Sequence, residues 1–454
     1  MAARTPATES QAPGVFFSIR DSFSLSAKLD PVDGYSHVMA GDIAAALTDN
    51  GWPCQAFPTW TLKNEIALFR PGRYGFVMGF NLIPDMEVGE TDRGDKITFY
   101  NMWRKHSRTP VIAVLIDQAF HHLGRIRKYL PLADDLALAV LERSDMPFLQ
   151  GAGIPSERMA HLPWGGPPPD AKPKPFGQRR HDLVFHGGLP AAKTETEFQE
   201  QFLALGASVD VVQAMSRAVE TIVEEGAGVE SAVRAGLRSR GIESDIFNID
   251  QFCKLLQMTE RQARTIGRHR FLTAFADLPV HFFGDFPADF QRGFPRATFH
   301  AGVPFRRIIE VTRDAKLSLS DTIGWRENAH LRLTYAIPYG CLPVAERNPR
   351  LERDFTDMKN IIFTAYPHRD AADKARAVLD DPRRGQDMVD AARPIYEARY
   401  TWRETVKVLA PFLPPPVPPA ERKPAEGKAP RKASRPKSAP KARPRRGRRR
   451  GSRR

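Results

Sequence analysis

The stretch DLVFHGGLPAAKT, residues 182–194, runs from an apolar segment into two glycines and on toward a predicted helix. Continuous apolar runs of this kind are typical of strands in a parallel sheet that is covered on both faces. Gly187 and Gly188 let the backbone approach an anion closely, and a helix that begins just after them would favour a phosphate group. The alternative is an ordinary tight turn, which the stretch alone does not exclude.

Apolar runs of the same kind lie on both sides of this stretch. After it, strands are predicted at 279–286, 297–302, 315–321 and 341–346, with helices at 304–314, 328–337 and 370–379. Before it, strands are predicted at 14–19, 75–80 and 111–116, with helices at 34–51 and 132–143. Alternation of strands and helices is the signature of doubly wound parallel sheets. The sequence therefore predicts an α/β fold with two Rossmann-like doubly wound domains.

Changes in composition divide the chain. Pro and Gly are concentrated at 161–180, the best internal boundary, and helical periodicity at 194–275 interrupts the second domain. The predicted parts are a disordered N-terminus (1–13), an N-terminal Rossmann-like domain (14–165), a linker (166–180), a C-terminal Rossmann-like domain (181–410) with the helical insertion (194–275), and a Pro-rich and basic disordered tail (411–454).

The positive charge of the chain is concentrated at its C-terminal end. Residues 421–454 hold 16 of the 67 Lys and Arg residues and 2 of the 53 Asp and Glu residues, so the remainder is neutral, with 51 of each sign. This segment lacks aromatic and large aliphatic residues, so burial cannot offset its ordering entropy and it is predicted to be disordered. The whole chain is 42% hydrophobic without a run of 18 apolar residues, which predicts a folded protein with no transmembrane segment.

Several common sites lack their residues. The chain has no GxGxxG, GxxxxGK[ST], HExxH or GxSxG motif, which argues against the usual dinucleotide, P-loop, zinc-protease and hydrolase sites. Cys54, Cys253 and Cys341 are too far apart for a CxxC pair. A disulfide framework or zinc knuckle is therefore not expected, and a reducing cytoplasm fits. The first 14 residues lack the apolar stretch of a secretory signal, so export by that route is not expected either.

The stretch DTIGWRENAHLRLTYAIPYGCLPVAERN, residues 321–348, contains the second candidate site. A strand ends, a loop follows and a helix begins, so Glu327, His330 and Arg332 are predicted to cluster at the carboxyl edge of a parallel sheet. Open α/β sheets bind their ligands at that edge. A carboxylate can accept sugar hydroxyls, while an arginine and a helix N-terminus can hold a diphosphate. The alternative is a solvated helix start with an ordinary surface arginine.

The order and spacing of several segments resemble those of GT-B glycosyltransferases. The segments are DGYSHVMAGDIAAALTDNGWPCQAF (33–57), AGIPSERMAHLPWGG (152–166), GGLPAAK (187–193), ENAHLRLTYAIPYGCLPVAE (327–346) and the closing helices at 370–410. The pair His330–x–Arg332 particularly resembles the spore-protein, CgeB-like branch of that family. The resemblance spans residues 14–412 apart from the helical insertion. It implies transfer of a sugar from a nucleotide-sugar donor to an acceptor.

The resemblance implies a donor site in the C-terminal domain and an acceptor side in the N-terminal domain. The donor-binding residues that it implies include Gly187, Gly188, Lys193, His330 and Arg332. The diphosphate would lie over the two glycines and the lysine, while the His–x–Arg pair would stabilise charge on the leaving phosphate. No metal and no cofactor besides the donor substrate are expected.

The resemblance also implies catalytic residues, with one departure from the family pattern. Glu327 takes the place of the glutamate that lies near the sugar. Tyr335 stands where many retaining relatives have a second glutamate that holds the ribose, and its hydroxyl cannot accept a diol in the same bidentate way. Glu346 or a backbone group would then substitute. On the acceptor side, Asp117 or His121 would serve as the base.

Two other functions stay open. The chain could be a catalytically inactive GT-B scaffold whose insertion docks a partner. Alternatively, it could bind nucleic acid or an anionic membrane surface through the basic segment 421–454. The acceptor is open as well, between a polysaccharide, a lipid and a protein. The expected location is the cytoplasm, either free or peripheral at the inner face of the membrane.

Overall fold

The computed structural model describes residues 12–18, 33–58, 74–81, 87–90, 96–98, 109–129 and 135–417. The predicted disorder of residues 1–11 and 418–454 concerns residues outside this set and stays a prediction. The predicted start of the disordered tail at residue 411 is wrong, because the Trp52 indole N–H donates to the Pro414 carbonyl oxygen and the Val417 N–H donates to the Gly51 carbonyl oxygen, both at 2.8 Å. Across the described ranges, no helix combines the length and the apolar character needed to cross a membrane.

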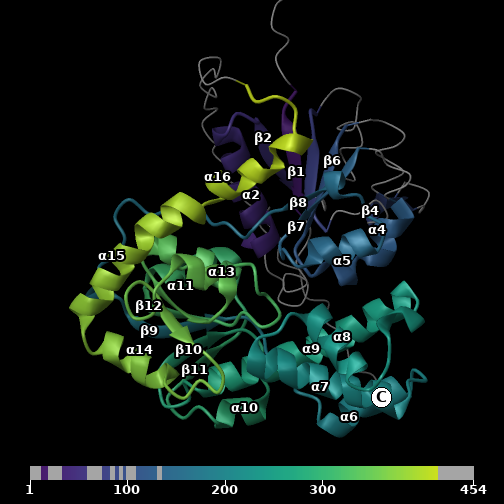
Figure 1. The fold of residues 1–454 in the computed structure, drawn as a ribbon. Helices are drawn as coiled ribbons and strands as arrows, with labels where there is room; N and C mark the ends of the chain where they lie inside the picture. The colour runs from purple at the N-terminus through teal and green to yellow at the C-terminus, as the bar shows by residue number, and fades with distance from the viewer. Residues whose placement is uncertain are drawn as a thin grey trace, which may run out of the picture. The chain divides into compact units, whose positions relative to one another are not determined.

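Within the described residues, the first sheet has six parallel strands in the order β2-β1-β3-β6-β7-β8 (Figure 1). The strands are β1 (Gly14–Ser18), β2 (Cys54–Pro58), β3 (Val77–Phe80), β6 (Val111–Leu115), β7 (Leu136–Val140) and β8 (Met159–His161), with β4 (Glu87–Glu90) and β5 (Lys96–Thr98) as a separate antiparallel pair. The accompanying helices are α2 (Tyr35–Asp49), η4 (Ala119–His121), α4 (Leu123–Tyr129), α5 (Asp145–Gly151) and η6 (Ser156–Arg158).

The second sheet, counted in the same way, has six parallel strands in the order β11-β10-β9-β12-β13-β14. The strands are β9 (His181–His186), β10 (Val280–Phe283), β11 (Thr298–His300), β12 (Ala315–Ser320), β13 (Leu342–Glu346) and β14 (Ile362–Thr364). The helices around it are η7 (Phe176–Gln178), α10 (Ala288–Arg292), α11 (Phe305–Arg313), α12 (Leu331–Thr334), η9 (Ile337–Tyr339), α13 (Pro349–Asp354) and α14 (Ala371–Leu379). The strand order reverses between β9 and β12, which is where such sheets bind ligands. The prediction of two Rossmann-like doubly wound sheets is confirmed.

The helical insertion lies between β9 and β10, as predicted. It comprises α6 (Glu195–Leu203), α7 (Val209–Glu225), α8 (Val229–Arg238), η8 (Ser244–Ile246) and α9 (Ile249–Thr273). Phe252 and Leu256 of α9 share a core cluster with Phe120 and Leu123, which follow β6 of the first sheet. Gln257 Nε2 also donates to the Phe120 carbonyl oxygen at 3.0 Å. The insertion is therefore packed on the first domain while its last helix leads into the second sheet.

The closing helices α15 (Pro382–Arg399), α16 (Trp402–Thr405) and η10 (Val406–Phe412) return to the first domain, as the resemblance implied. The Trp402 backbone N–H donates to the Gly166 carbonyl oxygen at 2.8 Å. The Trp402 ring packs edge-on against Trp164, with ring centroids 5.9 Å apart. Helix α15 also contacts β13 of the second sheet, so this end of the chain contacts both sheet domains.

Two predicted helices are wrong. Residues 136–140 (LALAV) form the buried strand β7 between β6 and β8, not part of a helix at 132–143, because a continuous apolar run also suits a strand covered on both faces. The helix predicted at 328–337 is reduced to the single turn α12, followed by η9. Pro338 interrupts helical hydrogen bonding there, and Gly340 ends η9 in the left-handed region at φ +73°.

Candidate functional site

Three of the predicted donor-binding residues, Gly187, His330 and Arg332, lie together where the order of the second sheet reverses. Arg332, in the first turn after the β12 loop, donates from Nε to the His186 carbonyl oxygen at 2.7 Å, at the end of β9. Its Nη1 donates to Asp321 Oδ1 at 2.6 Å, directly after β12. The guanidinium also lies over the Phe185 ring, 4.5 Å from its centroid. The structure therefore brings the 187–193 turn and the 327–332 segment together, as the sequence predicted.

The turn after β9 requires glycine at its first position. Gly187 has φ +138°, a conformation that other residues rarely adopt, and a Cβ atom there would lie 2.7 Å from Arg332 Nη2. Gly284, after β10, packs against the same turn, since a Cβ atom on it would lie 2.4 Å from the Gly187 carbonyl oxygen. The Gly-Gly turn is thus held close to both the arginine and the neighbouring strand.

Arg268 of α9 completes this arrangement, and the sequence analysis missed it. Its Nε donates to Asp321 Oδ2 at 2.9 Å and its Nη1 donates to the Gly188 carbonyl oxygen at 2.7 Å. Burial alone would raise the pKa of Asp321, but the Arg268 and Arg332 guanidinium groups hold it well below its ordinary value. Burial lowers the pKa of Arg332 only to about 10, so it stays charged at neutral pH. The two arginines and one carboxylate carry one net positive charge.

A basic cavity of about 820 Å³ opens beside the Gly-Gly turn. Gly188, Lys193, Arg264 and Arg268 line it, together with Asp285 after β10. The volume falls within the range of pockets that hold small-molecule ligands. The predicted phosphate-binding residues Gly188 and Lys193 therefore do face a cavity of suitable size and charge.

The structure gives no support to the prediction that a helix N-terminus binds the phosphate here, which stays a prediction. Helix α6 begins at Glu195, and its N-terminus is already capped by its own side chains. Thr194 Oγ1 accepts from the Glu197 backbone N–H at 3.2 Å, while Glu197 Oε2 accepts from the Thr194 N–H at 2.7 Å. A carboxylate already occupies this end, so the positive groups in contact with the turn are the side chains of Arg268 and Arg332.

His330 lies beside the arginines as a neutral side chain. Its Nδ1 accepts from the Arg332 backbone N–H at 3.2 Å and so caps α12. Burial, together with the charges of Arg332 and Arg268, holds the pKa of His330 well below its ordinary value. Any contact that it makes with a phosphate would therefore be a neutral hydrogen bond and not a charge pair.

Tyr335 is a packing residue in this structure. Its hydroxyl donates to Asp42 Oδ2 of α2 at 2.6 Å, and its ring is 2% exposed. Burial raises the pKa of Asp42 to about 6. Because the Tyr335 hydroxyl is already engaged, its contacts give no support to the predicted role in binding the donor.

Glu346 ends β13 at the same sheet edge as Asp321. Its Oε2 accepts from the Thr322 backbone N–H at 2.8 Å, and its Oε1 lies 3.5 Å from His368 Nε2. Burial raises its pKa to about 8. The Glu346 carboxyl can therefore share a proton with His368 or accept a hydrogen bond from a ligand hydroxyl. Its predicted contact with the ribose stays a prediction.

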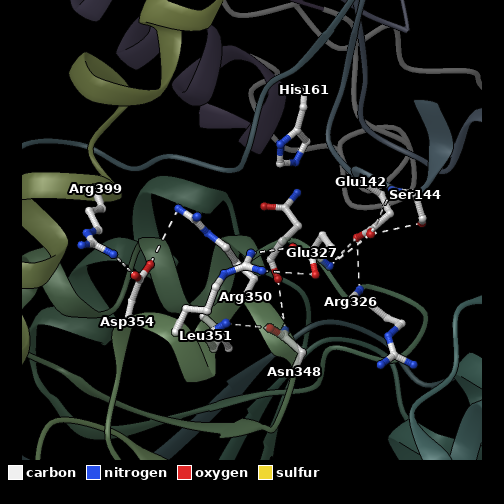
Figure 2. Close-up of polar contacts among 12 residues, drawn as sticks. Glu142, Ser144, His161, Arg326, Glu327, Asn348, Arg350, Leu351, Asp354 and Arg399 are labelled. Atoms are coloured by element: carbon white, nitrogen blue, oxygen red, sulfur yellow. Dashed lines mark hydrogen bonds and ion pairs between the residues drawn. The ribbon is translucent and has the colours of Figure 1, made fainter. Parts of the chain in front are cut away.

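Glu327 belongs to a neighbouring group of contacts, shown in Figure 2. Its carboxylate lies 2.5 Å from Arg353 Nη2, and its backbone N–H donates to Glu142 Oε1 at 3.1 Å. Glu142, which follows β7 of the first domain, also accepts from the Arg326 N–H at 3.1 Å. Burial raises the pKa of Glu142 to about 7. The first domain thus supports the loop that presents Glu327.

The two predicted acceptor-side residues both follow β6 but have different partners. Asp117 Oδ2 accepts from Asn81 Nδ2 at 3.3 Å and lies 3.8 Å from His122 Nε2. Burial alone would raise the pKa of Asp117, but the contact with His122 helps to bring it below its ordinary value, which weakens it as a base. His121 Nε2 lies 3.7 Å from Glu260 Oε2 of α9, so it faces the insertion.

In the part of the chain that the structure describes, no group of three or more His, Cys, Asp or Glu side chains is arranged to hold a metal ion. The expectations that the protein needs neither a metal nor an organic cofactor remain predictions.

A known family model matches the part of the chain that contains the arginine cluster and most of the second sheet. Residues 261–410 match the Glycosyl transferase-like family model. The matched range is about a third of the chain, and it contains Arg268, Asp321, Glu327 and Arg332. None of the curated proteins compared with the chain matches it. The finer resemblance to the CgeB-like branch stays a prediction.

Solved structures similar to the chain include two complexes with UDP-glucose and a sucrose-phosphate synthase. Anabaena HepE in complex with UDP-glucose has 12% identity and a TM-score of 0.45, with 88% of this chain and 98% of that chain covered. An alpha-glucosyltransferase in complex with UDP-glucose and DNA has 8% identity and a TM-score of 0.49, with 86% and 95% covered. Sucrose-phosphate synthase of Thermosynechococcus elongatus has 11% identity and a TM-score of 0.46, with 88% and 97% covered. These identities are too low to transfer a function.

Proposed function

We propose that the protein is a glycosyltransferase that takes a sugar from a nucleotide-sugar donor. The observation that carries this proposal is the convergence of Arg268, Asp321 and Arg332 on the Gly187–Gly188 turn. This cluster lies at the reversal point of a Rossmann-like sheet, where such sheets bind nucleotides. The Glycosyl transferase-like match covers all three of these charged residues and so adds support.

In this proposal the leaving group is a nucleoside diphosphate. The bond between the anomeric carbon and the diphosphate oxygen breaks, an acceptor oxygen bonds to that carbon, and the acceptor proton passes to a base or to water. Arg268 and Lys193, which line the cavity beside Gly188, would stabilise the negative charge that develops on the diphosphate. Arg332 is only 6% exposed, so it would act mainly by holding Asp321 and the turn in place.

Glu327 is proposed to position the donor sugar. Arg353 and the backbone contact with Glu142 hold it in one place, which suits a carboxylate that accepts sugar hydroxyls. Asp117 is retained as the acceptor-side base, with His121 as the alternative. Transfer is proposed to need no metal ion, with the cationic side chains beside Gly188 neutralising the diphosphate.

The experiment that tests the proposal is a screen of nucleotide sugars for stabilisation of the full chain. A ligand that binds the folded state raises the unfolding free energy by mass action, by about 2.7 kcal/mol at a concentration 100 times its Kd, and the unfolding midpoint rises with it. Donors that stabilise the protein are then assayed for slow hydrolysis to the free nucleoside diphosphate. Binding together with hydrolysis supports an enzyme, binding alone supports the inactive scaffold, and no binding by any donor contradicts the proposal.

A further inference from the structure

The basic cavity continues away from the Gly-Gly turn along one face of α9. The helix lines it with Lys254, Met258, Arg261, Thr265 and Arg268. Their spacing of four and three residues puts all five on one stripe of the helix. Fourteen residues of α-helix span about 21 Å, so the three cations of the stripe recur about every 10 Å. We refer to the part of the cavity that these five residues line as the α9 groove.

The outer cations of the α9 groove have no acidic partners. Lys254 and Arg261 are exposed and form no ion pair with any residue that the structure describes. Arg264 and Arg268, by contrast, are paired with Glu260 and Asp321. The lining includes one carboxylate, that of Asp285. The groove therefore has an excess of positive charge that a bound anion would neutralise.

The uncharged side chains of the α9 groove indicate which kind of anion fits. Gln201, Gln262 and Thr265 lie among its cations. The Gln262 amide donates to the Lys193 carbonyl oxygen and the Thr265 hydroxyl donates to the Arg261 carbonyl oxygen, both at 2.9 Å, so the Gln201 amide and the Thr265 oxygen are the groups that can bind a ligand hydroxyl. The aromatic side chain in the lining, Phe198, is 3% exposed and offers no free face for stacking nucleobases. These features favour an acidic saccharide over a single-stranded nucleic acid.

We infer that the α9 groove binds the acceptor, and that the acceptor is an extended saccharide chain that carries carboxylate groups. The inference rests on the proposed function, because the Arg268 end of the groove reaches the turn over which the donor diphosphate is proposed to lie. The reacting hydroxyl would lie at that end. Carboxylates farther along the chain would pair with Arg261 and Lys254, since guanidinium and ammonium groups form charge-assisted hydrogen bonds with them.

The test is calorimetric titration of the full chain with a galacturonic acid hexamer, a neutral glucose hexamer and a thymidine oligonucleotide, all at one ionic strength. The test variant combines Lys254→Gln with Arg261→Gln. The control combines Arg238→Gln with Arg240→Gln at the end of α8, which are exposed arginines outside the groove. The acidic hexamer should bind wild type and control alike and the test variant about tenfold more weakly, while the neutral hexamer should not bind.

Three outcomes would overturn the inference. Equal affinity in the test variant and wild type would attribute binding to the basic segment 421–454, which every protein in the experiment retains. Preferential binding of the oligonucleotide that is lost in the test variant would assign the groove to nucleic acid. Failure of wild type to bind the acidic hexamer, while it still binds a nucleotide sugar, would refute this inference and leave the proposed function standing. Thermal unfolding confirms that each variant is folded.

Discussion

Replacement of Arg268 by alanine tests the donor pocket most sharply. The side chain joins α9 to Asp321 through Nε at 2.9 Å and to the Gly188 carbonyl oxygen through Nη1 at 2.7 Å. It is 15% exposed, so it is the more accessible of the two arginines that hold Asp321. The substitution removes a positive group beside the turn and leaves Asp321 with Arg332 as its partner.

The expected effect on binding is larger than the expected effect on folding. A hydrogen bond to a charged group contributes about 1.5–3 kcal/mol, so loss of one from the diphosphate should weaken donor binding by about 10- to 100-fold. Asp321 keeps its 2.6 Å contact with Arg332 in the variant. Unfolding free energy should therefore fall by about 1–2 kcal/mol, which is less than the loss of a whole buried ion pair.

The assay is calorimetric titration of wild type and Arg268→Ala with the nucleoside diphosphate of the best donor, with thermal unfolding in parallel. Arg270→Ala is the matched control, because Arg270 lies half a turn farther along α9, pairs with Glu224 at 3.2 Å and lies outside this cavity. The control should bind like wild type. A folded Arg268→Ala protein whose Kd stays within about twofold of wild type would refute the role assigned to Arg268.

Further predictions concern four residues. Gly187→Ala should weaken donor binding, because a Cβ atom would lie 2.7 Å from Arg332 Nη2; calorimetry tests this. Tyr335→Phe should lower the unfolding free energy by about 1–3 kcal/mol by orphaning a buried carboxyl, yet leave donor affinity unchanged in titrations. Glu346, whose pKa is raised to about 8, favours folding at acidic pH and loses this contribution as pH rises. Denaturant titrations of Glu346→Gln should therefore show a flatter decline toward pH 8 than wild type. Glu327→Gln should lower turnover with little change in the unfolding midpoint, and wild-type turnover in this variant would remove Glu327 from the site.

Two sequence signals predict most of the fold. Continuous apolar runs indicate the strands, and helical periodicity indicates the helices of the insertion. The runs at 14–19 and 111–116 became buried strands, and the helical insertion was found from periodicity alone. The run at 136–140 fits a helix as well as a strand, since an all-buried strand and a buried helix can share one apolar pattern. The helix predicted at 132–143 is therefore wrong there. Strand β14, at Ile362–Thr364, is too short to give a periodic signal.

The site was only partly predictable, because its contacts join distant parts of the chain. Gly187 and Arg332 could be found from local sequence, and the structure places them against each other. Arg268 carries no local signal, since only the folding of α9 back onto the sheet brings it to Asp321. Likewise, the contact between Tyr335 and Asp42 depends on how the C-terminal helices pack on the first domain, which no short motif encodes.

The central claim is that the edge between β9 and β12 holds the diphosphate of a nucleotide sugar. The most direct measurement is a crystal structure of the full chain soaked with a nucleoside diphosphate that stabilises it in solution. We predict phosphate density between the Gly188 backbone and the side chains of Arg268 and Lys193. Diphosphate density at another place on the protein, with this edge empty, would contradict it.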